Sequence, residues 1–150
     1  MGADIKSPMN EEERWTHLVQ LDEELLRGGF VLTEWCSFIV READTAFASG
    51  ANLASILTAV SGIETFLRSE APEAKRARLV DLINGAMIDE ELRQDLHVLR
   101  KYRNSWVHVD DPWEDEKLLG DPEAAALELE QMALFAARTL RRTIYSNPWI

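Results

Sequence analysis

Apolar residues recur at steps of three and four along almost the whole chain, and this spacing limits the possible folds more than any other feature of the sequence. It places apolar side chains on one face of an α-helix, whereas a half-buried strand needs strict alternation, which no stretch contains. The sequence therefore predicts an all-α protein. Glycine and proline breaks divide the pattern into expected helices at 11–27, 31–48, 51–69, 73–84, 89–108 and 122–145.

Short connections between these segments favour an up-and-down bundle of about five long helices, with 73–84 as a shorter one. Residues 11–147 are expected to form a single domain, in which 109–121 is an acidic loop. Residues 1–10 are expected to be a disordered N-terminal tail, and 148–150 a C-terminal tail. The expected core includes Trp15, Leu18 and Val19 in the first helix, Trp35, Cys36 and Phe47 in the second, and Ile56, Val60 and Ile63 in the third.

The composition excludes several classes of protein. With 150 residues, 46% of them hydrophobic, the chain is long enough for one compact domain with its own core. Cys36 is the single cysteine, so no intrachain disulfide can form, and no window is apolar enough for a membrane helix. A cytoplasmic protein without membrane contact is expected. The net charge of -11 opposes broad binding of nucleic acid, DNA included, unless positive charge is concentrated locally.

An arginine interrupts the apolar seam of the helix expected at 89–108. The inward positions of that helix, at steps of three and four, are Leu92, Leu96, Leu99, Arg103 and Trp106. Burying a guanidinium without a partner is costly. Arg103 must therefore pair with an acid, for which Glu64 is the candidate, or face a cavity, a ligand or a second subunit.

Positive charge is concentrated on this same helix. Between residues 92 and 108 there are four lysines and arginines and one acid, in a chain that is strongly acidic overall. Cations in this arrangement suit a phosphate-bearing ligand, and His97, Arg100 and Lys101 are candidate substrate-binding residues. Two structural alternatives stay open. His97 can be a hydrogen-bonded structural residue, and Arg100 and Lys101 can be the ordinary solvated face of a helix.

The run from Leu96 to His108, LHVLRKYRNSWVH, resembles the signature of the HEPN superfamily, the "higher eukaryotes and prokaryotes nucleotide-binding" domains. That signature is an arginine, usually a polar residue next, and a histidine four to six positions on, near the end of a long helix. Here it stands as Arg103, Asn104 and His108. The preceding helix, with Ile63-Glu64 followed by Leu67-Arg68, also looks like HEPN sequences, and the resemblance covers about Glu11 to Tyr145.

The resemblance implies a HEPN-like helical homodimer whose motif helices face each other. In many members it implies a metal-independent endoribonuclease of toxin–antitoxin, phage-defence or RNA-processing systems, so RNA and an antitoxin or other protein are the expected partners. By resemblance, His108 would transfer the proton, Arg103 would bind the phosphate and Asn104 would orient them. One subgroup carries a modifiable tyrosine two places after the histidine, but this chain has Asp110 there.

Helix geometry sets a condition on how these residues can meet. On an unbroken helix, Arg103 and His108 point about 140° apart and lie about 7.5 Å apart along the axis, whereas Asn104 and His108 share a face. Either the helix loosens after Arg103, or two chains related by a twofold axis supply their motifs to one cleft. We favour the twofold arrangement.

Several features keep a second function open. The acids between Asp110 and Glu116 lie where RNA would run, and they fit a lid, a docking surface for a basic partner, or a member that no longer binds RNA. The alternative function is a non-catalytic helical dimer that binds a nucleotide or a protein, with Arg103 and Glu64 as a structural pair. Neither the acids nor the three histidines have metal-ligand spacing, so no metal or cofactor is expected. Trp106 is expected in the core, and Trp113 is expected to cover the end of its helix.

Overall fold

The computed structural model describes residues 8–147, and within that range the chain is helical, with no β-strand. This confirms the all-α prediction. The elements, in chain order, are α1 (Glu11–Leu25), α2 (Glu34–Ala48), α3 (Asn52–Ser69), the 3-10 helix η1 (Pro72–Ala74), α4 (Leu79–Gly85), α5 (Glu90–Val107), α6 (Glu116–Gly120) and α7 (Pro122–Ile144).

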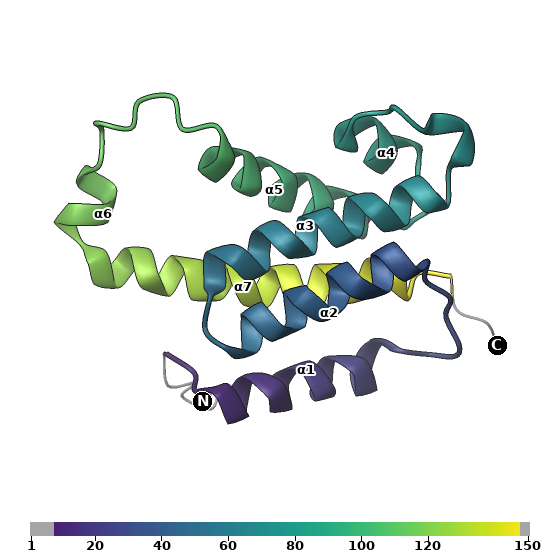
Figure 1. The fold of residues 1–150 in the computed structure, drawn as a ribbon, viewed down its shortest axis with the longest axis horizontal. Helices are drawn as coiled ribbons and strands as arrows, with labels where there is room; N and C mark the ends of the chain where they lie inside the picture. The colour runs from purple at the N-terminus through teal and green to yellow at the C-terminus, as the bar shows by residue number, and fades with distance from the viewer. Residues whose placement is uncertain (1–7, 148–150) are drawn as a thin grey trace.

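The long helices form a bundle in which successive members run in alternating directions (Figure 1). α7 is the longest, and it contacts α1, α2, α3, α5 and α6. α3 packs on α2 and α7 and also contacts α4 and α5. The end of α5, the following loop, α6 and the start of α7 extend beyond the rest of the bundle (Figure 1). No helix in the described part of the chain is long and apolar enough to cross a membrane.

Side-chain caps fix where several helices begin. Asn10 accepts a hydrogen bond from the Glu13 N–H, and the Glu13 carboxylate accepts one from the Asn10 N–H, which forms a capping box. Asp89 and Asp121 cap α5 and α7 by accepting a hydrogen bond from the backbone N–H of Leu92 and of Ala124, and Pro122 occupies the first helical position of α7. These two aspartate caps are the ones that the sequence predicts.

The core lies between α3, α7 and the inner faces of the other helices. The predicted residues Leu18, Cys36, Phe47, Ile56, Val60 and Ile63 are all buried in it. Trp15, Val19 and Trp35 were expected there, but they are exposed, so this part of the prediction is wrong. The buried residues of α1 are instead Arg14, Leu18 and Leu21.

A buried arginine explains why α1 turns this face inward. Arg14 is 2% exposed, and its Nη2 donates to Glu130 Oε2 of α7 at 2.9 Å. Its Nη1 donates to the Phe47 carbonyl at 2.9 Å and to Asn52 Oδ1 at 2.7 Å, and its Nε donates to the Met9 carbonyl. Because every part of the guanidinium has a partner, the arginine takes the core position and Trp15 turns outward.

A second buried arginine joins α1, α2 and α7 near the C-terminal end of α7. Arg141 is 3% exposed, and both of its Nη atoms donate to the Asp44 carboxylate of α2, each at 2.9 Å. Its Nε donates to Asp22 Oδ1 of α1, which also accepts from the Tyr145 hydroxyl. The bidentate pair with Asp44 fixes α2 against α7, and the bond to Asp22 fixes α1.

Several predicted boundaries differ from the structure, for example at the end of α1 and the start of α2, and three segments differ more clearly. The helix expected at 73–84 is split into η1 and α4, and the loop expected at 109–121 contains α6. The disordered tail expected at 1–10 is wrong at its inner end, because the Met9 N–H donates to buried Glu130 and Asn10 caps α1. Residues 1–7 and the predicted tail at 148–150 lie outside the described residues.

Candidate functional site

α5 presents the three motif residues at its C-terminal end. Leu92, Leu96 and Leu99 are buried beneath it, as the spacing predicts. Arg103 lies at the edge of this seam and is half-buried. The helix is uninterrupted to Val107, and His108 forms its C-cap with its backbone N–H on the Asn104 carbonyl at 2.9 Å.

The Arg103 guanidinium is available to a ligand. Its Nε donates to Asn104 Oδ1 at 2.9 Å, so the two adjacent motif side chains are joined. Within residues 8–147, no carboxylate lies within ion-pair distance of Arg103 and neither Nη nitrogen has a hydrogen-bond partner. The buried side-chain nitrogen and oxygen atoms that lack a hydrogen-bond partner in this range are Arg68 Nε and Thr139 Oγ1, so both Nη nitrogens of Arg103 are accessible to solvent. The two nitrogens therefore face solvent with their donors free, which is the geometry that binds a phosphate in bidentate fashion.

Glu64 does not pair with Arg103. Glu64 Oε2 accepts from Arg68 Nη1 at 3.2 Å, one turn further along α3. The expected pair between Arg103 and Glu64 is therefore wrong, because the arginine at the next turn of its own helix already neutralises this carboxylate.

His108 and Arg103 do not meet within one chain. The His108 side chain is exposed and has no hydrogen bond to any described residue. α5 does not loosen after Arg103, since it is α-helical to Val107. Of the two arrangements that the sequence left open, the loosened helix is thus absent.

His97 is a linker between two helices. Its Nε2 lies 2.8 Å from Asn84 Oδ1 of α4, and its Nδ1 accepts from Arg100 Nε at 3.4 Å. Because both ring nitrogens have partners, His97 is not free to bind a substrate, and the structural alternative describes it. Burial lowers the pKa of His97, and the charges of Arg100, Lys101 and Arg93 lower it further.

This pKa shift predicts an acid-sensitive fold. Because the folded state holds His97 neutral, the unfolded chain binds more protons than the folded protein once the pH falls below about 6.5. The contribution of His97 to the free energy of unfolding should therefore be constant above that pH and should decrease as the pH falls towards the lower pKa of the folded state. Urea unfolding at about pH 7 and about pH 5.5 measures this, and His97→Gln should flatten the dependence. His17, whose pKa burial also lowers, contributes with the same sign and remains in both proteins.

Cations without a carboxylate partner gather on α5. Seven lysines and arginines of the described chain have no such partner. They are Arg27, Arg41, Lys75, Arg76, Arg100, Lys101 and Arg103. Three of the seven therefore lie within four residues of one helix, next to the motif. Lys101 is exposed, and Arg100 uses only its Nε, so both have charge available for a ligand.

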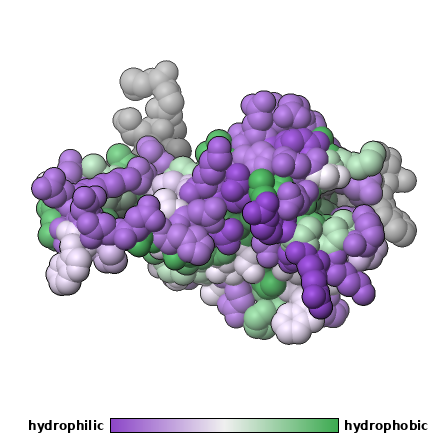
Figure 2. Space-filling view, turned by 90° about the horizontal axis from the view of Figure 1, so that it is seen from above, coloured by the Kyte–Doolittle hydropathy of each residue, from purple (hydrophilic) through white to green (hydrophobic). Residues whose placement is uncertain are grey.

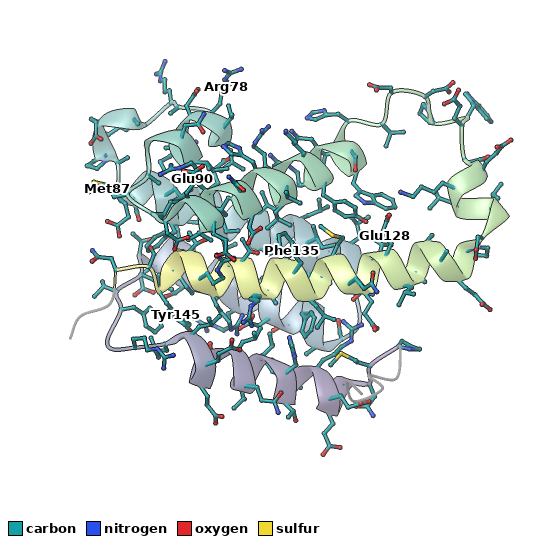
Figure 3. All side chains as sticks on the ribbon, turned by 180° about the vertical axis from the view of Figure 1, so that it is seen from behind. Arg78, Met87, Glu90, Glu128, Phe135 and Tyr145 are labelled. Atoms are coloured by element: carbon teal, nitrogen blue, oxygen red, sulfur yellow. The ribbon has the colours of Figure 1, made fainter. Side chains whose placement is uncertain are left out.

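Two residues that position the site through polar contacts, Arg93 and Glu128, were not predicted. The Arg93 guanidinium donates to the carbonyls of Ile83, Asn84, Ala86 and Ile88, so it closes the end of α4. At the other end of α5, Glu128 of α7 accepts from the Tyr102 hydroxyl at 3.1 Å and pairs with Lys117 of α6 at 3.1 Å (Figure 3). A cation in the first turn of the helix that follows a short one is the signal that could have indicated the role of Arg93.

The segment after His108 exposes both acids and apolar side chains. None of the acids from Asp110 to Glu116 pairs with a lysine or arginine of the described chain. Trp113 was expected to cover the end of α5, but it is 90% exposed, because the loop carries it away from the bundle. Trp106 is half-buried rather than fully in the core. The exposed apolar residues from the end of α5 to the first part of α7, which we call the apolar end surface, are Val107, Val109, Trp113, Leu118, Leu119 and Leu127.

No protein-family model, no curated protein and no solved structure matches this chain significantly. Among residues 8–147, no group of three or more histidine, cysteine, aspartate or glutamate side chains is arranged to hold a metal ion.

Proposed function

We propose that this protein is a HEPN-like, metal-independent endoribonuclease that acts as a homodimer. The observation that carries the proposal is the Arg103 guanidinium, which has two free Nη nitrogens and no carboxylate partner in the described chain. It lies at the end of an intact helix, five residues before an exposed histidine. In a chain of net charge -11, an uncompensated cation at such a place favours an anionic ligand.

In this proposal the three motif residues divide the chemistry of RNA cleavage. A histidine takes the proton of the ribose 2′-hydroxyl, and the 2′-oxygen forms a bond to phosphorus while the bond from phosphorus to the 5′-oxygen breaks. The leaving 5′-oxygen receives a proton from a protonated histidine. Arg103 stabilises the charge on the crowded phosphate, and Asn104 holds the Arg103 Nε. The products are a 2′,3′-cyclic phosphate and a 5′-hydroxyl.

The proposed chemistry needs a second copy of the chain. Two histidines serve as base and acid, whereas each chain supplies one motif histidine, which does not contact its own Arg103 in the described residues. The apolar end surface begins at the end of α5, next to the motif, and exposed apolar residues of this kind can be covered by a partner subunit. We place the second copy there, with one motif from each chain in a shared cleft.

Arg103→Ala tests the proposal directly. We expect the cleavage rate of RNA in EDTA to fall about 10²–10³-fold, because charge stabilisation of the phosphate is lost. We expect the free energy of unfolding to change by only about 1 kcal/mol, because the variant strands no carboxylate and loses one hydrogen bond. Arg103→Lys, which keeps the charge without the bidentate geometry, should retain part of the activity.

The opposite result would support the alternative function. If Arg103→Ala strongly destabilises the protein and leaves RNA cleavage unchanged, Arg103 is structural and the nuclease proposal is wrong. Mixing the wild type with an excess of His108→Ala subunits tests the shared cleft. Each heterodimer then holds a single motif histidine, so cleavage per wild-type subunit should fall if one cleft draws its base and its acid from two chains, whereas independent sites would keep it unchanged.

A further inference from the structure

A second group of free cations lies in the segment between η1 and α4. Lys75 and Arg76 are exposed and have no carboxylate partner within residues 8–147, and Arg78 makes only a long contact of 3.4 Å to Asp81. This segment is held in place, because Arg68 Nη2 donates to the Ala77 carbonyl at 2.8 Å and the Ala77 N–H donates to Ala74. The cations therefore extend from a fixed backbone.

Specific contacts place α4, which follows this segment, beside the flank of α5 that leads to the motif. His97, Arg100 and Asn104 follow one another at steps of three and four, so they form one flank of α5. His97 bonds to Asn84 on α4, and Arg93 on the same flank holds the carbonyls at the end of α4. α4 thus borders this flank along the upper side of the molecule in Figure 1, and Arg78 extends outward from its beginning in Figure 3.

The distances suit a chain of phosphates. From Arg103 back to His97 is about 9 Å along α5, and from Asn84 back to Arg78 is about 9 Å along α4, at about 1.5 Å per residue. Five of the seven cations without a carboxylate partner belong either to α5 next to the motif or to the segment that leads into α4. The face that contains α4 and α5 is mostly hydrophilic when seen from above (Figure 2). The free positive charge of an acidic protein is therefore gathered mainly in two groups, one on α5 next to the motif and one before α4.

We propose that residues 75–78 form a second phosphate-binding site, which binds the backbone of single-stranded RNA several nucleotides away from the cleaved bond. The inference rests on the proposed nuclease function and adds the substrate class. A single strand needs only these two groups of cations for its phosphates, whereas a duplex would bring a second row of phosphates to a protein of net charge -11. Single strands also have the backbone freedom to align the 2′-oxygen, phosphorus and 5′-oxygen for in-line attack.

The test combines a charge reversal with a matched control. Lys75→Glu/Arg76→Glu should raise KM about 10-fold or more for a single-stranded oligoribonucleotide of about twelve nucleotides and leave kcat unchanged. A dinucleotide, which is too short to reach the second site, should be cleaved as by the wild type. Arg27→Glu/Arg41→Glu makes the same charge change at the two free cations outside α5 and the 75–78 segment. This control should leave the cleavage of both substrates unchanged.

Each outcome is decisive. An equal rise in KM for the control pair would mean that net charge alone is responsible, and an equal loss on the dinucleotide would mean that the motif itself is disturbed; either result overturns the second site. Fluorescence anisotropy with the same oligonucleotide separates the two proposals. A further outcome is that neither the wild type nor any variant cleaves RNA, while the wild type binds it and Lys75→Glu/Arg76→Glu does not. In that case the second site stands and the nuclease proposal fails. Absence of any binding overturns the site.

Discussion

His108→Ala is expected to reduce RNA cleavage by about 10²-fold or more, because general acid–base catalysis by a histidine contributes about 10²–10⁴-fold. The fold should be unaffected, since the His108 side chain is exposed and makes no hydrogen bond within the described residues. Its backbone N–H, which caps α5 through the Asn104 carbonyl, is retained in alanine. Cleavage of single-stranded RNA in EDTA and urea unfolding, measured on the same preparation, give the two numbers.

The control for this experiment is His17→Ala. His17 lies on α1, near the Phe47 ring, and it has no part in the proposed chemistry. The His17→Ala variant should therefore cleave RNA at the wild-type rate even if its stability falls. Equal activity of the His108→Ala variant and the wild type would remove the histidine from the mechanism. Activity that falls only in proportion to unfolding would show that His108 is structural.

Glu130→Gln is expected to destabilise the protein by roughly 3–5 kcal/mol, because it leaves the buried Arg14 guanidinium without a counter-charge. The two side chains are 2% and 5% exposed, so water cannot replace the lost charge. The same carboxylate accepts from the Met9 N–H, so the start of α1 also loses a contact. The free energy of unfolding from urea titration measures the loss.

Glu90→Gln provides the matched comparison, since it makes the same chemical change in the ion pair of Glu90 with Arg93. The Glu90 side chain is 70% exposed, and an exposed pair of this kind contributes about 0–1 kcal/mol. A loss for Glu130→Gln as small as that for Glu90→Gln would contradict the assignment of the buried pair as a structural element of the core.

The sequence predicts helices well because their periodicity and caps are local. Asp89 and Asp121 mark helix starts within a few residues of the side chains that they cap. The inward face of α1 was not predictable in the same way, because burial of Arg14 depends on Glu130, 116 residues away. The pattern alone therefore favoured Trp15, which is the more apolar neighbour.

The candidate site was predicted in part for a similar reason. Spacing along one helix indicated that Arg103 lies at the seam and that Arg100 and Lys101 lie near it. The partners of these residues come from other helices, and the sequence gives no distance between helices. Glu64 was therefore assigned to Arg103 rather than to Arg68, and the bond from His97 to Asn84 was missed.

One carboxylate ties the protruding end of the bundle together. Glu128 holds both the Tyr102 hydroxyl and the Lys117 ammonium, whereas α6 itself contributes no buried residue. The local stability of this end is thus set by a few polar bonds near solvent, and it is lower than the stability of the core. Backbone amides of residues 109–120 will consequently exchange their hydrogens through local opening, long before the molecule unfolds as a whole.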